Sequence, residues 1–302
     1  MDLDTTPSID RPPAAAAVAV PPAPACRERT LASRRRSVEG AIAAMHERLG
    51  EPLSLGALAR AAASSPYHFD RIFRQVTGVP PFRFLAALRL DEARRLLLTT
   101  RYSATAICFE VGYNSVGSFT RQFSEAVGMP PHRLRCFAAA GAAAASLARA
   151  DEVDAVPPAP DRAGVTGRVE APEGFEGVVF VGLFATPLPS GRPAACVLLH
   201  GPGPFRIAAV ADGVYHLFAA GVPAQAAAAG AGALLHDQVL RGAAAAPLAV
   251  RGGRAEGSAE VVLRPRDPVD PPILVSLPVL LTERLSAPGD GAAASALASH
   301  LH

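Results

Sequence analysis

Residues 65–83 read SPYHFDRIFRQVTGVPPFR, and a variant of this stretch, SVGSFTRQFSEAVGMPPHR, returns at residues 115–133. Both copies open on a serine, carry two phenylalanines at the same spacing and end in Gly-x-Pro-Pro-x-Arg. A repeat in which the aromatic spacing, the first residue and the terminator all return together indicates a duplicated structural unit. This pair decides the fold of the first half of the chain.

Each copy has the pattern of one amphipathic helix with defined ends. Ser65 is a good N-cap, and Pro66 suits the first helical position, where its missing N–H would have had no partner. The residues expected to face inward recur at helical spacing: Phe69, Ile72, Phe73 and Val76. Gly78 ends the helix, and the two prolines that follow Val79 prevent its continuation. The second copy repeats this design around Phe119, Phe123 and Val127.

Further amphipathic segments surround the two copies. The spacing of their apolar residues predicts helices over residues 37–49, 54–62, 81–98 and 103–111. The second and fourth of these each precede one copy, so we expect two helix-turn-helix units joined by the long third helix. Gly112 lies in the second turn, where a left-handed residue is expected. Ala63 takes the equivalent place in the first turn, and the same conformation would cost it about 1 kcal/mol more than glycine.

The basic charge is concentrated around the repeat. The chain has 302 residues, contains no lysine and carries a formal net charge of +2. Residues 27–135 hold 17 arginines against 9 acidic residues, whereas the rest of the chain holds 12 against 18. An excess of this sign indicates that the repeat-containing part meets a polyanion.

The span from Val38 to Arg135 resembles the DNA-binding domain of the AraC/XylS family of bacterial transcription regulators. The resemblance rests on ALARAAASSPYHFDRIFRQVTGVPPFRFLAALRLDEARRLL and on AICFEVGYNSVGSFTRQFSEAVGMPPHRLR, and it covers about a third of the chain. It implies seven helices whose two helix-turn-helix units enter adjacent major grooves on one face of the duplex. The groove-facing residues that it implies are Tyr67, His68, Asp70, Arg71 and Arg74 in the first unit, and Val116, Gly117, Ser118, Thr120 and Arg121 in the second.

The two units differ in what they offer to bases. Val116 and Gly117 have no side-chain hydrogen-bond donor, so we expect the first unit to supply most of the specificity. In the second unit, Val116 would meet a thymine methyl, and Arg121 would contact either a guanine edge or a phosphate. Three roles stay open for Asp70: repelling phosphate, orienting a neighbouring arginine, or accepting from cytosine N4. Phosphate contacts are expected from Ser65, Arg83, Ser115, His132 and Arg133.

The fold class expected is a multidomain chain, an all-α double helix-turn-helix domain followed by a mainly β, sandwich-like domain. The expected divisions are a disordered tail over 1–36, the DNA-binding domain over 37–137, a linker over 138–173, a β-rich sensor or assembly domain over 174–286 and a disordered tail over 287–302. Within the tail, Arg34, Arg35 and Arg36 either reach DNA phosphates or form a solvated surface.

The β-rich domain is predicted from short apolar runs separated by Gly and Pro turns. Strands are expected over residues 177–183, 194–199, 205–207, 214–219, 248–250, 259–263 and 273–281, with a helix near 225–240. The run GPGPFRIAAVADGVYHLFAA is similar to a segment of transthyretin-like or carboxypeptidase-regulatory-like sandwich domains. This similarity bears on architecture alone.

No residue pattern indicates catalysis, a metal site or a cofactor, so we expect a protein that is not an enzyme. The four cysteines lack metal-ligand spacing, and reduced thiols in the cytoplasm are the simplest account. The acidic start lacks the basic region of a secretory signal, and no membrane contact is expected.

The function expected is sequence-specific regulation of transcription. Its partners would be double-stranded DNA, RNA polymerase if the protein is an activator, and a small-molecule effector at the C-terminal domain. Two alternatives stay open: a small-ligand or carbohydrate-binding β-sandwich with ancillary DNA binding, and a DNA-binding protein whose C-terminal domain only dimerises. The oligomeric state is not predicted.

Overall fold

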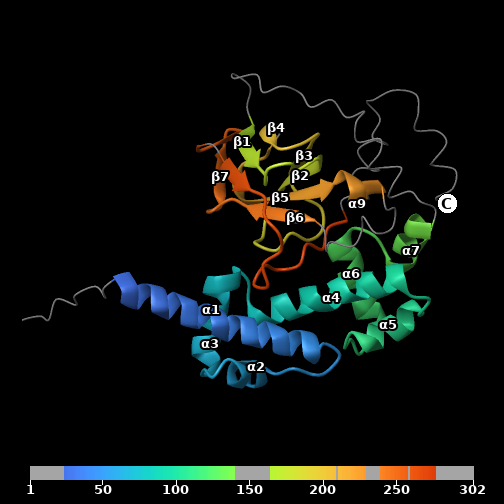
Figure 1. The fold of residues 1–302 in the computed structure, drawn as a ribbon. Coiled ribbons are helices and arrows are strands. Elements are labelled where there is room, and N and C mark those ends of the chain that lie inside the picture. The colour runs from blue at the N-terminus through green and yellow to red at the C-terminus, as the bar shows by residue number, and fades with distance from the viewer. Residues whose placement is uncertain (1–23, 140–163, 209, 229–238, 258, 277–302) are drawn as a thin grey trace, which may run out of the picture.

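The computed structural model describes residues 24–139, 164–208, 210–228, 239–257 and 259–276. In this part of the chain, a helical half over residues 24–139 lies against a β-rich half over residues 164–276 (Figure 1). None of the helices described is long and apolar enough to cross a membrane.

The helical half contains two helix-turn-helix units, as the sequence predicted. The first is formed by α2 (Leu55–Ala61) and α3 (Pro66–Thr77), and the second by α5 (Ala104–Glu110) and α6 (Val116–Val127). Helix α4 (Pro81–Thr99) joins the units, α1 (Pro24–Glu47) precedes the first, and α7 (Pro131–Ala139) follows the second. The helices expected from apolar spacing are therefore present, with ends shifted by a few residues except in α1.

Two hydrophobic cores lie on either side of the middle of α4. The first core packs Phe69 and Phe73 of α3 against Phe84 of α4, and successive rings stand 5.4 Å apart in edge-to-face contact. The second core holds Phe119 and Phe123 of α6, which are both fully buried. Because α4 contributes apolar side chains to both cores, it positions one unit relative to the other, and the predicted spacer role is confirmed.

The helix ends follow the repeat closely. Gly78 and Gly128 end α3 and α6 in the left-handed conformation, with φ of 77° and 96°. In the two turns, Gly112 has φ 84° and Ala63 has φ 47°, and Ala63 is the one non-glycine residue with positive φ in the described part of the chain. The expectation for both turns is confirmed. Ser65 occupies the N-cap position of α3, but its side chain accepts no capping hydrogen bond.

The β-rich half consists of two sheets. Strands β4 (Gly203–Ile207), β1 (Val165–Glu170) and β9 (Ala259–Val262) form a three-stranded sheet in that order, with β1 and β9 parallel. The other sheet runs β3-β2-β5-β7-β8, and β6 pairs with β5. Its strands are β3 (Ala195–Leu199), β2 (Gly177–Phe184), β5 (Gly213–Pro223), β7 (Leu248–Arg251), β8 (Arg254–Ala255) and β6 (Leu240–Ala243).

One apolar core joins the two sheets. Val169 and Phe205 of the smaller sheet pack with Leu183 and Leu217 of the larger sheet, and all four side chains are buried. The shared core holds the nine strands of the described residues together as one β-rich body.

Three predictions about this architecture were wrong. Helix α1 begins at Pro24, so residues 24–36 are helical and not part of a disordered tail. Their few large apolar groups suggested disorder, but a segment continuous with a packed helix needs no new nucleus. The expected linker over 138–173 contains β1. Residues 273–276, expected to begin a strand, belong to none in the structure.

The other predicted elements differ less from the structure. The helix expected near 225–240 is the short α9 (Ala224–Ala228), and residues 229–238 lie outside the described residues. Residues 1–23 and 287–302, which were expected to be tails, also lie outside them.

The two halves meet through two segments of the β-rich half. One is the loop between β2 and β3, in which Leu188 packs against both helical cores. The other is residues 264–276, named here the C-terminal strap. Its Val269 enters the first core and its Leu274 enters the second, and both side chains are buried. The strap therefore contacts both helix-turn-helix units.

Candidate nucleic-acid interface

The outward face of α3 carries the polar side chains that the sequence placed in the groove. Tyr67 is 85% exposed, which is unusual for an aromatic residue and leaves its ring and hydroxyl free to contact a partner. His68, Arg71 and Arg74 are also exposed, and Asp70 is half-buried. The structure thus brings all five predicted residues of the first unit onto one short helix.

Hydrogen bonds order part of this face. Arg74 Nε donates to Asp70 Oδ2 at 2.9 Å, one helical turn away. Arg71 Nη2 lies 3.3 Å from Nδ1 of His68. Of the three roles left open for Asp70, orienting a neighbouring arginine is the one for which the structure shows a contact. The pair also neutralises part of the charge of Arg74 and leaves Arg71 as the less compensated cation.

The face of α6 is chemically poorer, as predicted. Gly117, Ser118 and Arg121 are exposed, whereas Thr120 is half-buried. Val116 is half-buried and packs against the second core, so less of it is available for the expected contact with a thymine methyl. Arg121 is the only long polar side chain among the five residues predicted for this helix.

The five residues predicted to contact phosphate lie at helix N-termini and are exposed. Ser65 and Ser115 are the N-cap residues of α3 and α6, and the Ser115 side chain accepts from the backbone N–H of Ser118 at 3.4 Å. Arg83 lies in the first turn of α4, and His132 and Arg133 lie in the first turn of α7. Because a helix N-terminus attracts anions, these positions suit phosphate groups.

The β-rich half contacts the opposite ends of the recognition helices. The backbone N–H of Gly191 donates to the carbonyl of Ala126 at 2.7 Å, and that of Ser276 donates to the carbonyl of Val127 at 3.4 Å. Pro187 of the same loop lies beside Gly78 at the C-terminal end of α3. The contacts leave the N-terminal turns of α3 and α6 accessible.

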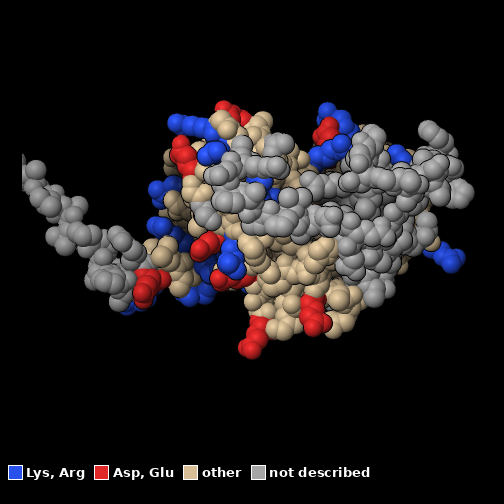
Figure 2. Space-filling model, turned by 90° about the horizontal axis from the view of Figure 1, so that it is seen from above, with Lys and Arg blue, Asp and Glu red and all other residues tan. Residues whose placement is uncertain are grey.

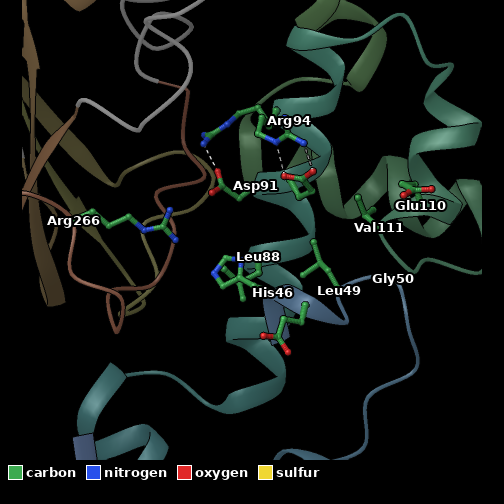
Figure 3. A pocket seen from close by; sticks show the side chains of 12 residues that line it. His46, Leu49, Gly50, Leu88, Asp91, Arg94, Glu110, Val111 and Arg266 are labelled. Atoms are coloured by element: carbon green, nitrogen blue, oxygen red, sulfur yellow. Dashed lines mark hydrogen bonds and ion pairs between the residues drawn. The ribbon is translucent and has the colours of Figure 1, made fainter. Parts of the chain in front are cut away.

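Arg94 of α4 fastens the strap to the helical half. Its side chain is 2% exposed, and its Nη1 donates to the carbonyl of Ile273 at 2.9 Å. The same guanidinium forms an ion pair with Asp91, one turn earlier on α4 (Figure 3). A buried charge is tolerated only with such partners, so Arg94 ties the position of the strap to the middle of α4.

A hollow of about 440 Å³ opens beside this contact, and residues of α1, α4, α5 and the strap line it. Figure 3 shows Arg266 of the strap reaching in from one side, His46 and Asp91 near the middle, and Glu110 of α5 on the far side. Desolvation, and after it the positive charge of Arg266, lower the pKa of His46. In the described residues, no group of side chains could hold a metal ion.

The face viewed from the β-rich side mixes charges of both signs. Figure 2 shows acidic and basic side chains interspersed there around the grey residues. A mixed surface of this kind has no uniform attraction for a polyanion.

A scan of family models matches residues 58–136 to one described as a helix-turn-helix domain. Among curated relatives, the uncharacterized HTH-type transcriptional regulator YobQ of Bacillus subtilis is 35% identical over 94 residues, which are 31% of this chain and 39% of YobQ. The HTH-type transcriptional regulator GlxA of Rhizobium meliloti is 34% identical over 124 residues, 40% of this chain and 38% of GlxA. The HTH-type transcriptional activator RhaS of Pectobacterium carotovorum is 32% identical over 103 residues, 34% of this chain and 37% of RhaS. The chain thus spans less than half the length of these relatives.

Two solved structures are similar to the helical half. An AraC-type transcriptional regulator from Chromobacterium violaceum is 27% identical, and the match covers 35% of this chain and 95% of that one, with a TM-score of 0.34. The DNA-binding domain of AdpA, solved in complex with a target DNA, is 30% identical over 34% of this chain and 95% of that one, with a TM-score of 0.33.

The helical half therefore contains a double helix-turn-helix domain of the kind found in transcription regulators. The family model and the sequence relatives confirm the resemblance to the AraC/XylS type for this part of the chain.

Two groups of residues near the interface were not found from the sequence. The contact of Arg94 with the strap could not be found, because it joins residues about 180 positions apart. The early part of α1 carried a signal, the run Arg34 to Arg36, but its composition favoured a tail over a helix.

Proposed function

We propose that the chain is a sequence-specific DNA-binding regulator of transcription. In it, α3 makes most of the base contacts that give specificity, and α6 provides a second, less specific contact with the DNA. The observation that carries this is the pair of exposed N-terminal turns. Tyr67, His68 and Arg71 on α3 can read base edges, whereas α6 offers mainly Arg121. The predicted phosphate contacts at four helix N-termini would fix the position of the domain on the backbone.

Two units in one chain allow binding without a dimer, because they can enter successive major grooves about one helical turn, or roughly 34 Å, apart. Affinity would come largely from arginine neutralising phosphate, so it should fall steeply with salt. RNA polymerase would be a partner if the protein activates, and the cytoplasm is the compartment in which both partners are met. None of these roles requires catalysis.

The test is selection of bound duplexes from a random pool by the full chain, followed by affinity measurements at fixed salt. We expect an enriched motif with a strongly specified half, read by α3, and a weakly specified half one turn away. Binding that persists while the recovered sequences stay random would contradict sequence-specific reading. An Arg133→Ala variant is the control, since it should enrich the same motif more weakly.

Regulation by a small effector is a second candidate role, and the hollow beside Arg94, which Arg266 and His46 line, favours it. Its walls come from α1, α4, α5 and the strap, so one ligand there would touch the helix that joins the two units, the second unit through α5, and the β-rich half. In contrast, the hollow bordered by Phe218 and Ile273 within the β-rich half has only about 50 Å³, well below the size of ordinary ligand pockets. We propose that the β-rich half is a β-sandwich whose role is to support the helical half that carries α3 and α6.

A thermal-shift screen with amino acids, polyamines and small carboxylic acids would test the effector role. A ligand of the hollow should raise the melting temperature of the full chain by mass action and should do so less in an Arg266→Ala variant. A shift that the variant keeps in full would place the ligand elsewhere.

A further inference from the structure

Helix α1 continues for more than three turns before the helix-turn-helix domain that the sequence outlined from residue 37. Figure 1 shows this early part of α1 extending past α3. Between α1 on one side and the α2–α3 turn and α3 on the other lies a groove of about 440 Å³. It opens beside His68, which is one of the predicted groove-facing residues of α3.

The rim of this groove offers hydrogen-bond donors and positive charge. Its floor is apolar and formed by the buried side chains of Val38, Ala62, Phe69 and Ile72. Its polar lining residues are Arg29, Thr30, Ser33, Arg34, Ser37, Ser64 and His68, and no aspartate or glutamate is among them. A site with hydroxyl groups, two guanidinium groups and no carboxylate fits an anion with several acceptor oxygens, such as a phosphate group.

The three consecutive arginines of α1 have different surroundings. Arg35 is engaged elsewhere, since its Nη2 lies 2.5 Å from Asp267 of the strap and its Nε lies 2.8 Å from Glu39. Arg36 is exposed and is not among the residues that line the groove. Arg34 is half-buried and lines it. Of the three consecutive arginines, Arg34 is therefore the one that adds positive charge to the groove, where Arg29 also lies.

We propose that this groove binds a backbone phosphate of the DNA, next to the major groove that α3 enters. Arg34 supplies charge together with Arg29, and the serine hydroxyls of α1 donate hydrogen bonds. The proposal rests on the proposed function for its choice of ligand, because the groove adjoins the reading face. It extends the contact surface of the protein beyond the two helix-turn-helix units.

The experiment compares Arg34→Ala with Arg36→Ala in the full chain, on one duplex of fixed random sequence. Both changes remove one positive charge from the same helix, but only one removes it from the groove. Each phosphate contact contributes about 0.9 to the slope of log affinity against log salt. When salt rises from 50 to 200 mM, the factor by which affinity falls should therefore be about 3.5 times smaller for Arg34→Ala than for the wild type. For Arg36→Ala this factor should equal that of the wild type.

Equal salt slopes for Arg34→Ala and the wild type would overturn the proposal, as would equal changes in the two variants. The outcome is separable from that of the proposed function. If the chain binds duplexes without sequence preference, the specific-reader function fails, but the slope of Arg34→Ala still decides whether the groove holds a phosphate.

Discussion

Replacing Arg94 by alanine should loosen the docking of the β-rich half on the helical half. Arg94 is 2% exposed on α4, where it pairs with Asp91 and donates to the carbonyl of Ile273 at 2.9 Å. The alanine variant leaves a buried carbonyl without its charged donor and a carboxylate without its cation. Because α4 also lies between the two helix-turn-helix units, the change acts where the strap meets both units.

The size of the effect follows from the hydrogen bond and the ion pair that the alanine variant removes. A hydrogen bond to a charged group contributes about 1.5–3 kcal/mol. The side chain of Asp91 is 23% exposed, so water recovers part of its solvation in the variant. We therefore expect a loss of about 2–4 kcal/mol in the free energy of unfolding. With a urea m-value of about 2 kcal/mol per molar, the midpoint should fall by about 1–2 M.

Arg95→Ala is the matched control. Arg95 is the next residue of the same helix, but its side chain is 50% exposed and pairs with Glu92 at the surface. Such a pair is worth at most about 1 kcal/mol. Urea unfolding of both variants, followed by far-ultraviolet circular dichroism, compares them directly. Equal midpoint shifts for the two variants would refute the view that Arg94 holds the two halves together.

Three further predictions concern single residues. Arg71→Ala should cost about 1–3 kcal/mol of binding and relax base choice at one position, whereas Arg133→Ala should weaken all duplexes alike; affinity measured on single-base variants of a selected site checks both. Gly112→Ala should lower the thermal midpoint, because φ is 84° and a Cβ would stand 2.9 Å from the carbonyl of Gly50; the strain alone is about 1–2 kcal/mol, and an unchanged midpoint would contradict it. A hydrogen bond from Arg35 lowers the pKa of Asp267, so the stability contributed by this pair is present at neutral pH and is lost as pH falls through the lowered pKa. In Asp267→Asn, the free energy of unfolding should therefore fall less steeply with decreasing pH than in the wild type. Identical acid titrations of the two proteins would count against the pair.

The helical half could be predicted in detail because its determinants are local. Phe69 and Phe73 recur one helical turn apart, and Gly78 ends their helix, as the repeat predicted. Ala63 shows the same, since its positive φ followed from its alignment with Gly112. Each of these features depends on residues close in the chain, and local sequence encodes them directly.

The contacts between the two halves could not be predicted, because they depend on residues far apart in sequence. Leu274 was expected in a strand from its apolar neighbours, but it enters the second helical core instead. Its backbone N–H donates to the carbonyl of Pro189 at 3.0 Å, so a loop replaces the partner strand. In a similar way, the sequence offered three roles for Asp70, and only the fold shows its ion pair with Arg74.

The central claim is that α3 and α6 read two adjacent major grooves from one chain. It is tested most directly by inserting five base pairs between the two halves of a selected site and measuring the affinity of the full chain. Because five base pairs turn one half by about half a helical turn, the two units could not engage both halves at once. We predict that affinity falls to that of a duplex with the first half alone. Unchanged affinity for the lengthened site would contradict the claim.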